Sequence, residues 1–420
     1  MIKGKENKSF LNIRSNKNNK TIIENISLEE NLIIKKSLNQ NNAKNMRLKD
    51  ENININKELK NITMSNILKK ANNYIYACIN GKLMNGIKKS SKNPKITTLT
   101  AIYNREKTIK AAIRSIQNQN MPDIEILVIN DASTDNSLNI SRQLQKQDPR
   151  IRIINNKENM GPLYSKSIGA LNANGKYIMY LDSDDLFINE NLFNICYEEA
   201  EKNNIDILEF SGFQSKYKYL NVSKKQIIPI YLRYKENNLT ITQPQLSTFI
   251  YKKKKNKIIK LIDGYLWGKC IRSEILRKAL YTIGKNIYQQ KMSYGDDRLI
   301  NFILFRVAYS FKFIHEYGII YYYTNNSIVH SNKTIRKIRN SNDELINLMN
   351  IFKFTKNSKD SEFAAFEVKC RWNKHILPGL NRENKKCAIK FLEQILNNKF
   401  INKENKKIIY NLWNKTINKN

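Results

Sequence analysis

Apolar and polar residues alternate in a regular order between Lys95 and Ser215. Short runs of apolar, mostly β-branched residues have the length of buried strands, and stretches with apolar residues at helical spacing separate them. The expected strands are 96–103, 124–130, 151–156, 176–182 and 205–213, and the expected helices are 106–119, 135–147, 161–174 and about 189–203. This alternation predicts an α/β fold with a mainly parallel sheet that helices cover on both faces.

The regular alternation stops beyond Gly212. Residues 216–260 are polar and basic and predict an irregular excursion. Further along we expect a loop and helix at 263–276, a loop and buried helix at 292–308, and a strand at 318–324. From about Thr334 we expect helices to the end of the chain.

Residues 1–94 are rich in Asn and Lys and contain only short apolar clusters. Such a composition without a repeating pattern is typical of a partly ordered extension. Pro94 marks the change to the α/β pattern. We therefore expect three parts, namely an extension at 1–94, an α/β domain at 95–333 and a helical region at 334–420.

The formal net charge of +36 over 420 residues invites a nucleic-acid or anionic-membrane partner. Residues 95–215, however, hold 13 Lys and Arg against 16 Asp and Glu, a net of −3, so the flanks carry +39. Much of the flanking charge alternates with Asn, which is typical of a composition bias spread over a solvated surface. The basicity therefore belongs to the flanks of the α/β domain.

The five cysteines and three histidines are scattered along the chain, without close C-x-x-C pairs. This spacing argues against a disulfide framework and against a structural zinc site. Polar residues follow Met1 where a signal peptide would be apolar, and no uninterrupted apolar run has the length of a membrane span. We expect a cytoplasmic location, in which the chain is either free or peripheral to a membrane.

Four acidic or hydroxyl residues follow the fourth expected strand in "YIMYLDSDDLF", namely Asp182, Ser183, Asp184 and Asp185. Carboxylates this close raise one another's pKa unless a positive charge lies among them. Oxygen ligands suit Mg²⁺ or Mn²⁺, which take one or two protein carboxylates together with phosphate oxygens and water. The stretch predicts a divalent metal site that neutralises a diphosphate leaving group. The alternative is a polar turn that caps the next helix.

Five further residues each have a chemical and a structural interpretation. Asp131 in "NDASTD" either accepts hydrogen bonds from a nucleobase or caps a helix. Asp296 and Asp297 in "SYGDDRLINF" either cap the next helix or supply a general base for an acceptor hydroxyl. Trp267 either stacks on a sugar ring or belongs to the core. Lys166 either contacts a phosphate or is solvated.

These motifs, in this order, resemble those of the family 2 glycosyltransferases of the GT-A fold. The likeness is specific over 95–215 and returns in "LWGKCIRSEIL", "YGDDRLINFILFRVAYSFKFI" and "GIIYYY". The resemblance implies that 95–215 binds a nucleotide sugar and that 216–333 forms the acceptor side.

The resemblance also implies a role for each candidate residue. "TAIYN" has Ala101 where proline is usual but keeps Tyr103 and Asn104, and Lys166 stands where arginine is usual. The implied donor-binding residues are Ala101, Tyr103, Asn104, Glu106, Asp131, Lys166, Asp182 and Ser183, with Asp131 at the nucleobase. The implied metal ligands are Asp184 and Asp182, the implied acceptor-side residues are Trp267 and Asp296, and the implied catalytic base is Asp297.

The activity implied by the resemblance is an inverting transfer of a sugar from a nucleotide sugar, expected to be a UDP-sugar. The acceptor is the hydroxyl of a glycan, a lipid or a protein, and the cofactor is Mn²⁺ or Mg²⁺. A basic nucleic-acid- or membrane-surface-binding protein with an inactive GT-A-like scaffold is the alternative. The joint presence of Asp131, Asp182, Asp184 and Asp297 favours the enzyme, so nucleic acid is not an expected partner.

Three other enzyme classes are less consistent with the sequence. The first expected strand ends in "AIYNRE", without G-x-G-x-x-G or G-K-[ST], which argues against NAD enzymes and P-loop NTPases. A nucleotidyltransferase built on a similar sheet is a third alternative. The missing glycine-rich loop and the base-like Asp297 further along the chain argue against it.

Overall fold

The structure is a computed structural model that describes residues 48–84, 86, 89–215, 227–230, 240–243, 251–254, 257–260, 265–322, 334–358 and 360–419. The chain divides into two compact units, Met1–Met64 and Ser65–Asn420. The described part of the first unit is the beginning of helix α3 (Leu48–Ile79). All other elements belong to the second unit.

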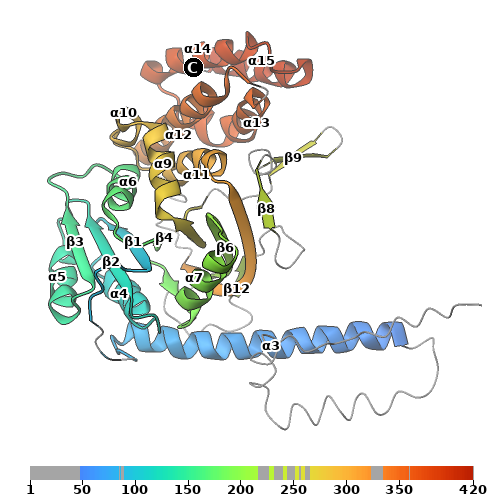
Figure 1. Ribbon diagram of the computed structural model, residues 1–420. Helices are drawn as coiled ribbons and strands as arrows, with labels where there is room; N and C mark the ends of the chain where they lie inside the picture. Colours follow the sequence, from blue (N-terminus) through green and yellow to red (C-terminus); the bar gives the residue numbers. More distant parts are fainter. Residues whose placement is uncertain are drawn as a thin grey trace, which may run out of the picture. The chain divides into compact units, whose positions relative to one another are not determined.

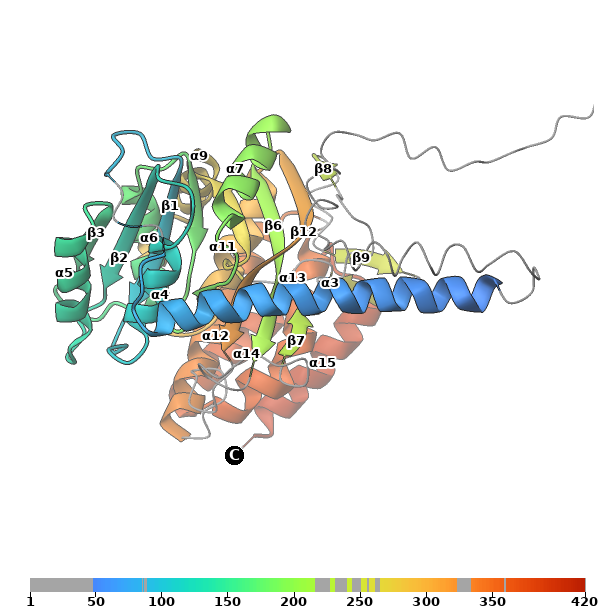
Figure 2. The ribbon, with the colours of Figure 1, turned by 90° about the horizontal axis from the view of Figure 1, so that it is seen from below.

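Four parallel strands form one half of the main sheet, in the order β3-β2-β1-β4 (Figures 1 and 2). They are β1 (Ile96–Ile102), β2 (Ile124–Asn130), β3 (Ile151–Asn155) and β4 (Tyr177–Tyr180). β1, β2 and β4 are buried along almost their whole length, as expected of strands covered on both faces. The expected strands and their parallel pairing are confirmed for this half.

The other half of the sheet is mixed. Its strands are β5 (Leu186–Phe187), β6 (Ile207–Ser215), β7 (Ile227–Ile230), β8 (Thr240–Thr242), β11 (Lys269–Arg272) and β12 (Ser310–Tyr322). β11 runs antiparallel between β4 and β6, whereas β12 is parallel to β6. The α/β class is therefore confirmed, but the sheet as a whole is mixed, because β11 enters against the direction of both neighbours.

Strand β11 lies where the sequence pattern predicted a loop before a helix. Its two apolar residues stand between Lys269 and Arg272, so no apolar run of strand length is visible. Lys269 lies opposite Glu209 in the β11–β6 register, and its Nζ is 3.6 Å from Glu209 Oε2. Both side chains are almost fully buried. The acidic partner neutralises a lysine that would otherwise be costly inside a sheet.

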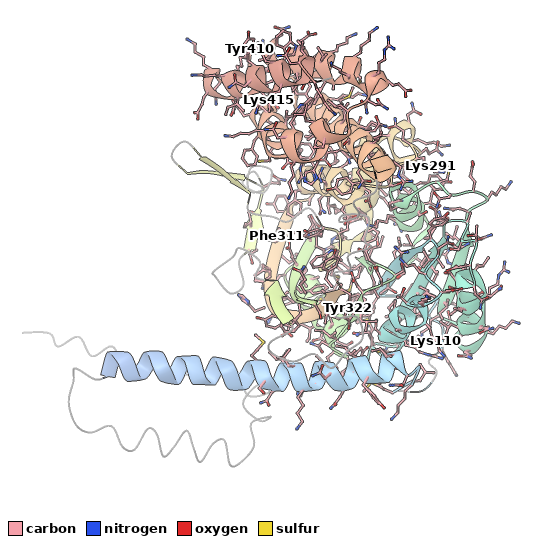
Figure 3. All side chains as sticks on the ribbon, turned by 180° about the vertical axis from the view of Figure 1, so that it is seen from behind. Lys110, Lys291, Phe311, Tyr322, Tyr410 and Lys415 are labelled. Carbon is pink, nitrogen blue, oxygen red and sulfur yellow. The ribbon has the colours of Figure 1, made fainter. Side chains whose placement is uncertain are left out.

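Strand β12 begins at Ser310, well before the strand expected at 318–324. Phe311 and Tyr322 lie near its two ends (Figure 3). Register shifts beside Tyr317 interrupt its pairing with β6, which explains why the apolar pattern is broken there. Most of the expected excursion and residues 323–333 lie outside the described residues. The described parts of the excursion are short strands, including the antiparallel pair β9 (Tyr251–Lys254) and β10 (Lys257–Lys260).

Helices cover both faces of the sheet, as expected. They are α4 (Ile109–Gln117), α5 (Ser137–Gln147), α6 (Pro162–Asn172), α7 (Leu192–Lys202), α9 (Ser273–Ile283), α10 (Lys285–Tyr288) and α11 (Asp296–Val307). Because side chains alternate along a strand, neighbouring strand residues enter different cores. Leu99 and Ile178 pack with α6, α9 and α11, whereas Ile96 and Tyr177 pack with α4 and α7.

The C-terminal part of the chain is helical from Thr334, as predicted. Its helices are α12 (Thr334–Thr355), α13 (Ser361–Arg371), α14 (Arg382–Leu396) and α15 (Lys403–Ile417), with a π-helical turn at Trp372–Ile376 and a 3₁₀ turn at Leu377–Gly379. Their buried residues belong to the same apolar cluster as those of α9 and α11. The helical region therefore shares a core with the α/β domain. None of the described helices combines the length and the apolar character that crossing a membrane requires.

The second half of α3 packs against α4. Its buried residues Leu68, Ala71, Ile75 and Cys78 follow helical spacing. Between them, the buried Tyr74 hydroxyl donates to Ser115 O at 2.6 Å. The compact unit consequently begins at Ser65, whereas the sequence pattern placed the start of the α/β domain at residue 95.

Candidate active site

Lys166 lies at the centre of three carboxylates, one that follows β4 and two that begin α11. Its Nζ is 2.6 Å from Asp297 Oδ1, 2.9 Å from Asp296 Oδ2 and 3.6 Å from Asp182 Oδ1. Lys166 belongs to α6, Asp182 follows β4, and Asp296 and Asp297 begin α11. With 9% of the lysine side chain exposed, the ammonium group is largely withdrawn from solvent. The fold thus assembles predicted donor, acceptor and catalytic residues around one cation.

Lys166 supplies one positive charge to this acidic cluster through its pairs with Asp182, Asp296 and Asp297. The sequence analysis expected Lys166 at a phosphate and a metal ion at Asp182 and Asp184, and the metal ion stays a prediction. The predicted contact of Lys166 with a phosphate stays a prediction.

The electrostatics of the cluster distinguish its two neighbouring aspartates. Burial raises the pKa of Asp297 to about 7, and Asp296 and Asp182 push it in the same direction against Lys166. Burial also opposes ionisation of Asp296, but Lys166 and hydrogen bonds hold its pKa below the usual value. The carboxylates keep the pKa of Lys166 well above its ordinary value despite burial. Near neutral pH, Lys166 is therefore charged and Asp297 is close to its own midpoint.

The backbone around Asp297 fixes the orientation of its side chain. Oδ2 of Asp297 accepts a hydrogen bond from Leu266 N at 3.3 Å. Its carbonyl oxygen accepts from Asn301 Nδ2 at 3.0 Å. Gly295, the N-cap of α11, has a φ of +78°, a left-handed conformation that favours glycine. This turn directs both aspartates of the first helical turn toward Lys166.

The predicted metal-binding stretch separates into a structural and an accessible part. Asp185 is fully buried, and its Oδ1 accepts from Tyr322 N at 2.9 Å, which ties the loop to the end of β12. Asp182, in contrast, has 37% of its side chain exposed. Desolvation within the cluster raises the pKa of Asp182, and Asp184 and Asp296 raise it further, while Lys166 opposes them.

Asp182 and Asp184 fit a divalent cation by donor chemistry. Both offer hard oxygen atoms at a strand end, and two carboxylates are as many as Mg²⁺ usually takes from a protein. Within the described ranges, no group of three or more His, Cys, Asp or Glu side chains is arranged to hold a metal ion. A metal here would depend on ligand oxygens from outside the protein. Ser183, between the two aspartates, is buried.

Asp131 lies at the end of β2 and holds the loop that leads into α6. Its Oδ1 accepts from Asn156 Nδ2 at 2.8 Å and from Met160 N at 3.0 Å, and its Oδ2 accepts from Gly161 N at 2.8 Å. The side chain is buried. Asp131 therefore has a structural role in placing α6, and with it Lys166. Its predicted contact with a nucleobase stays a prediction.

The predicted donor residues after β1 brace two neighbouring loops. Asn104, with a φ of +54°, donates to Thr134 Oγ1 at 3.2 Å, and its Oδ1 accepts from Thr134 N at 2.8 Å. Glu106 Oε2 accepts from Asn136 N at 3.1 Å, and Glu106 N donates to Asp135 Oδ2 at 3.1 Å. These reciprocal bonds fix the edge of the sheet at the ends of β1 and β2.

Two other residues predicted from the same motif differ in exposure. Ala101 lies within β1 and is half-buried. Tyr103 has an exposed ring at the mouth of the loop. An exposed aromatic ring beside a rigid loop offers a face on which a planar group can stack.

Trp267 is the middle ring of a three-ring stack. Its centroid lies 4.8 Å from that of Tyr265 and 5.8 Å from that of Tyr321, with interplanar angles of 19° and 9°. Burial raises the pKa of Tyr321, and the charges of Asp185, Asp182 and Asp184 raise it further, so the stack adjoins the acidic loop. Trp267 itself is buried, whereas Tyr265 is 48% exposed.

The sequence analysis selected Trp267 and missed both tyrosines of this stack. Tyr265 lies two positions before Trp267. Two aromatic residues at this spacing point to the same side of an extended segment, and this spacing could have identified Tyr265. Tyr321 belongs to the "YYY" run at the end of β12, where only the sheet shows which ring faces the site.

Residues 97–270 match the protein family described as Glycosyl transferase family 2. This part of the chain is similar to the members of that family. The match covers β1 to β6 and ends within β11, and so includes Asp131, Lys166, Asp182 and Trp267.

Two curated relatives are similar to this chain over about half of its length. The chain is 29% identical over 235 residues to the uncharacterized glycosyltransferase EpsJ of Bacillus subtilis, covering 56% of this chain and 63% of the relative. It is 30% identical over 236 residues to the cholesterol galactosyltransferase of Borreliella burgdorferi, covering 55% and 60%. The chain thus spans less than two thirds of the length of these relatives.

The fold is similar to that of a solved structure. The crystal structure of S. aureus TarS 1–349 in complex with UDP superimposes with a TM-score of 0.54 and 14% identity. The alignment covers 77% of this chain and 88% of that one. At this identity the likeness concerns the fold, and it agrees with the GT-A architecture expected from the sequence.

Proposed function

We propose that this chain is an inverting glycosyltransferase that moves a sugar from a nucleoside-diphosphate sugar to an acceptor hydroxyl. The observation that supports the proposal most strongly is the position of Asp297, whose Oδ1 lies 2.6 Å from Lys166 Nζ near the carboxyl end of the parallel strand β4. Ligands of α/β sheets collect at the carboxyl ends of their parallel strands. The family match and the exposed Asp182 beside the aromatic stack support the same assignment.

In the proposed reaction Asp297 acts as the general base. The acceptor hydroxyl gives its proton to the Asp297 carboxylate while its oxygen forms a bond to the anomeric carbon. The bond from that carbon to the diphosphate oxygen breaks on the opposite face, and the leaving nucleoside diphosphate keeps the electron pair. A pKa of about 7 suits the task, because a base works best when its pKa lies near the working pH.

Asp184 and Asp182 would hold a Mn²⁺ or Mg²⁺ ion that supplies charge neutralisation to the diphosphate. Lys166 adds a second positive charge, which its buried position keeps fixed. Asp131, Asn104 and Glu106 contribute by bracing the loops on the donor side. Ala101, Tyr103 and Ser183 are the remaining residues of the proposed donor site.

The donor we propose is a UDP-sugar, in agreement with the UDP complex of TarS. The proposed acceptor side comprises Trp267, Asp296 and the two tyrosines that stack with Trp267. The Borreliella relative is named a cholesterol galactosyltransferase, which indicates a lipid acceptor for that protein. A lipid acceptor would bring the present chain to a membrane surface, whereas a glycan or protein acceptor would not.

A screen of nucleotide sugars tests the proposed donor site. Thermal unfolding of the full chain is followed with each donor, with and without Mn²⁺, since a ligand that binds the folded state raises Tm. We expect one donor to stabilise the protein in a metal-dependent way, and we expect Asp184→Ala to abolish the metal dependence. The absence of stabilisation by all nucleotide sugars, together with the absence of sugar transfer, would contradict the proposed function.

A further inference from the structure

The loop that precedes α11 is held by two buried side chains of α12. Ser293 N donates to Asp343 Oδ2 at 2.8 Å, and Asn347 Nδ2 donates to Tyr294 O at 3.1 Å. Asp343 and Asn347 are 4% and 0% exposed. Two consecutive residues just before the Asp296–Asp297 pair are therefore fixed from the C-terminal helical region.

The turn at Gly295 brings the backbone into close approach with the same helix. A Cβ atom at this position would lie 2.5 Å from Asn347 Nδ2 and 3.3 Å from Glu344 Oε2. The left-handed φ of +78° already favours glycine. The turn that starts α11 thus fits against α12 with no space for a side chain.

Arg298, the residue after Asp297, continues this contact through a charge network. Its Nη1 donates to Glu344 Oε1 at 2.6 Å. From α13, Arg371 Nε donates to Glu367 Oε2 at 2.6 Å and lies 3.3 Å from Glu344 Oε1. Two arginines and two glutamates balance in charge, and both glutamate side chains are buried. The glutamates raise the pKa of Arg298 despite its burial, so the network stays ionised.

We infer that α12 is a positioning element of the active site. Asp343, Glu344 and Asn347 act on Asp297 from both sides, through Ser293–Gly295 before it and through Arg298 after it. They set the place of the Asp297 carboxylate relative to Lys166. This inference rests on the proposed function, in which Asp297 is the base. Displacement of a reacting group by about 1 Å can lower the rate about 100-fold. Contacts that fix the position of Asp297 therefore affect turnover directly.

A matched set of variants separates positioning from general stability. Asp343→Ala removes the acceptor of Ser293 N–H, whereas Asp343→Asn keeps an oxygen that can accept it. Asp360→Ala is the control, because it breaks the 3.2 Å pair between Asp360 Oδ2 and Arg306 at the other end of α11. We expect Asp343→Ala to lower kcat by about 10- to 100-fold. In the same variant we expect donor Kd to change by less than about twofold. Asp343→Asn should recover most of the wild-type kcat, and Asp360→Ala should leave kcat unchanged.

Hydrogen exchange provides a second measurement that does not need activity. In Asp343→Ala the amides of residues 293–298 should exchange faster, while those near Arg306 should keep the wild-type rate. Asn347→Ala, which removes the donor to Tyr294 O, is the second probe if Asp343→Ala does not fold. Equal effects of the Asp343 and Asp360 variants on kcat, or unchanged exchange at 293–298, would overturn the inference. An inactive wild type with faster exchange in Asp343→Ala would instead refute the proposed function.

Discussion

Lys166 Nζ and Asp297 Oδ1 lie 2.6 Å apart, although 131 positions separate the two residues in the sequence. The lysine favours the ionised form of Asp297, whereas burial and the charges of Asp296 and Asp182 oppose it. The balance places the pKa of Asp297 at about 7. Asp297 is thus an anion over part of the physiological range and can still accept a proton.

Replacing Asp297 with Asn should separate catalysis from donor binding. The amide keeps the size of the side chain but cannot accept a proton, so kcat should fall by about 100- to 10,000-fold. Donor Kd, measured by calorimetry on the same preparation, should stay within about threefold, because the base faces the acceptor. Wild-type turnover in this variant would remove Asp297 from the mechanism.

The pH dependence of kcat/KM should report the ionisation of Asp297. Below pH 7 the carboxyl group is mostly protonated and cannot act as base, so kcat/KM should fall about tenfold per pH unit toward acid. Above pH 7 the rate should level off until another group titrates. A profile that stays flat between pH 5 and 8 would contradict the assignment of Asp297 as base.

Lys166→Met should move that profile in a defined direction. Lys166 lowers the pKa of Asp297, so its removal raises this pKa and shifts the acid limb of kcat/KM to higher pH. Activity lost at pH 7 should partly return at pH 9. Lys166→Arg is the matched control, because it keeps the charge and should keep the position of the limb. If the acid limb does not move in Lys166→Met, Lys166 does not set the pKa of Asp297 and acts on another group, for example on the donor.

The parallel half of the main sheet, β1 to β4, was predictable because its pattern is local. The apolar runs of β1, β2 and β4 are long and buried, and helices with one apolar face separate them. The acidic residues from Asp182 to Asp185 were recognised because they directly follow an expected strand. Asp297 was found from the motif "SYGDDRLINF" and from the family resemblance.

What the sequence could not predict depends on contacts between distant segments. The charges of Lys269 and Glu209 cancel only once β11 and β6 pair, so β11 was interpreted as a loop. The ion pairs of Lys166 with Asp182, Asp296 and Asp297 depend on the position of α6, which the local sequence does not reveal. The contribution of α12 to the loop before Asp297 has no local sequence signal.

Tyr265 should affect acceptor binding more than donor binding. Its ring is 48% exposed and stacks on Trp267, so it offers an apolar face to a sugar or another apolar acceptor group. Tyr265→Ala should raise acceptor KM about 3- to 10-fold, in line with the roughly 1 kcal/mol that an aromatic contact contributes. Tyr265→Phe keeps the ring and should bind the acceptor nearly as well. A rise in donor KM alone would place Tyr265 on the donor side.

Removing one partner of the buried pair Lys269 and Glu209 should lower the free energy of unfolding more than replacing both partners with apolar residues. Their charged atoms are 3.6 Å apart, and Lys269 Nζ also donates to Tyr265 O at 2.6 Å. Lys269→Met removes the cation from the buried Glu209 and should lower the free energy of unfolding by about 3–5 kcal/mol. In Lys269→Met/Glu209→Met neither charge remains, so the double variant should be more stable than Lys269→Met alone. Urea unfolding of Lys269→Met, Glu209→Met and the double variant yields the coupling free energy, and purely additive values would show that the pair does not act as a unit.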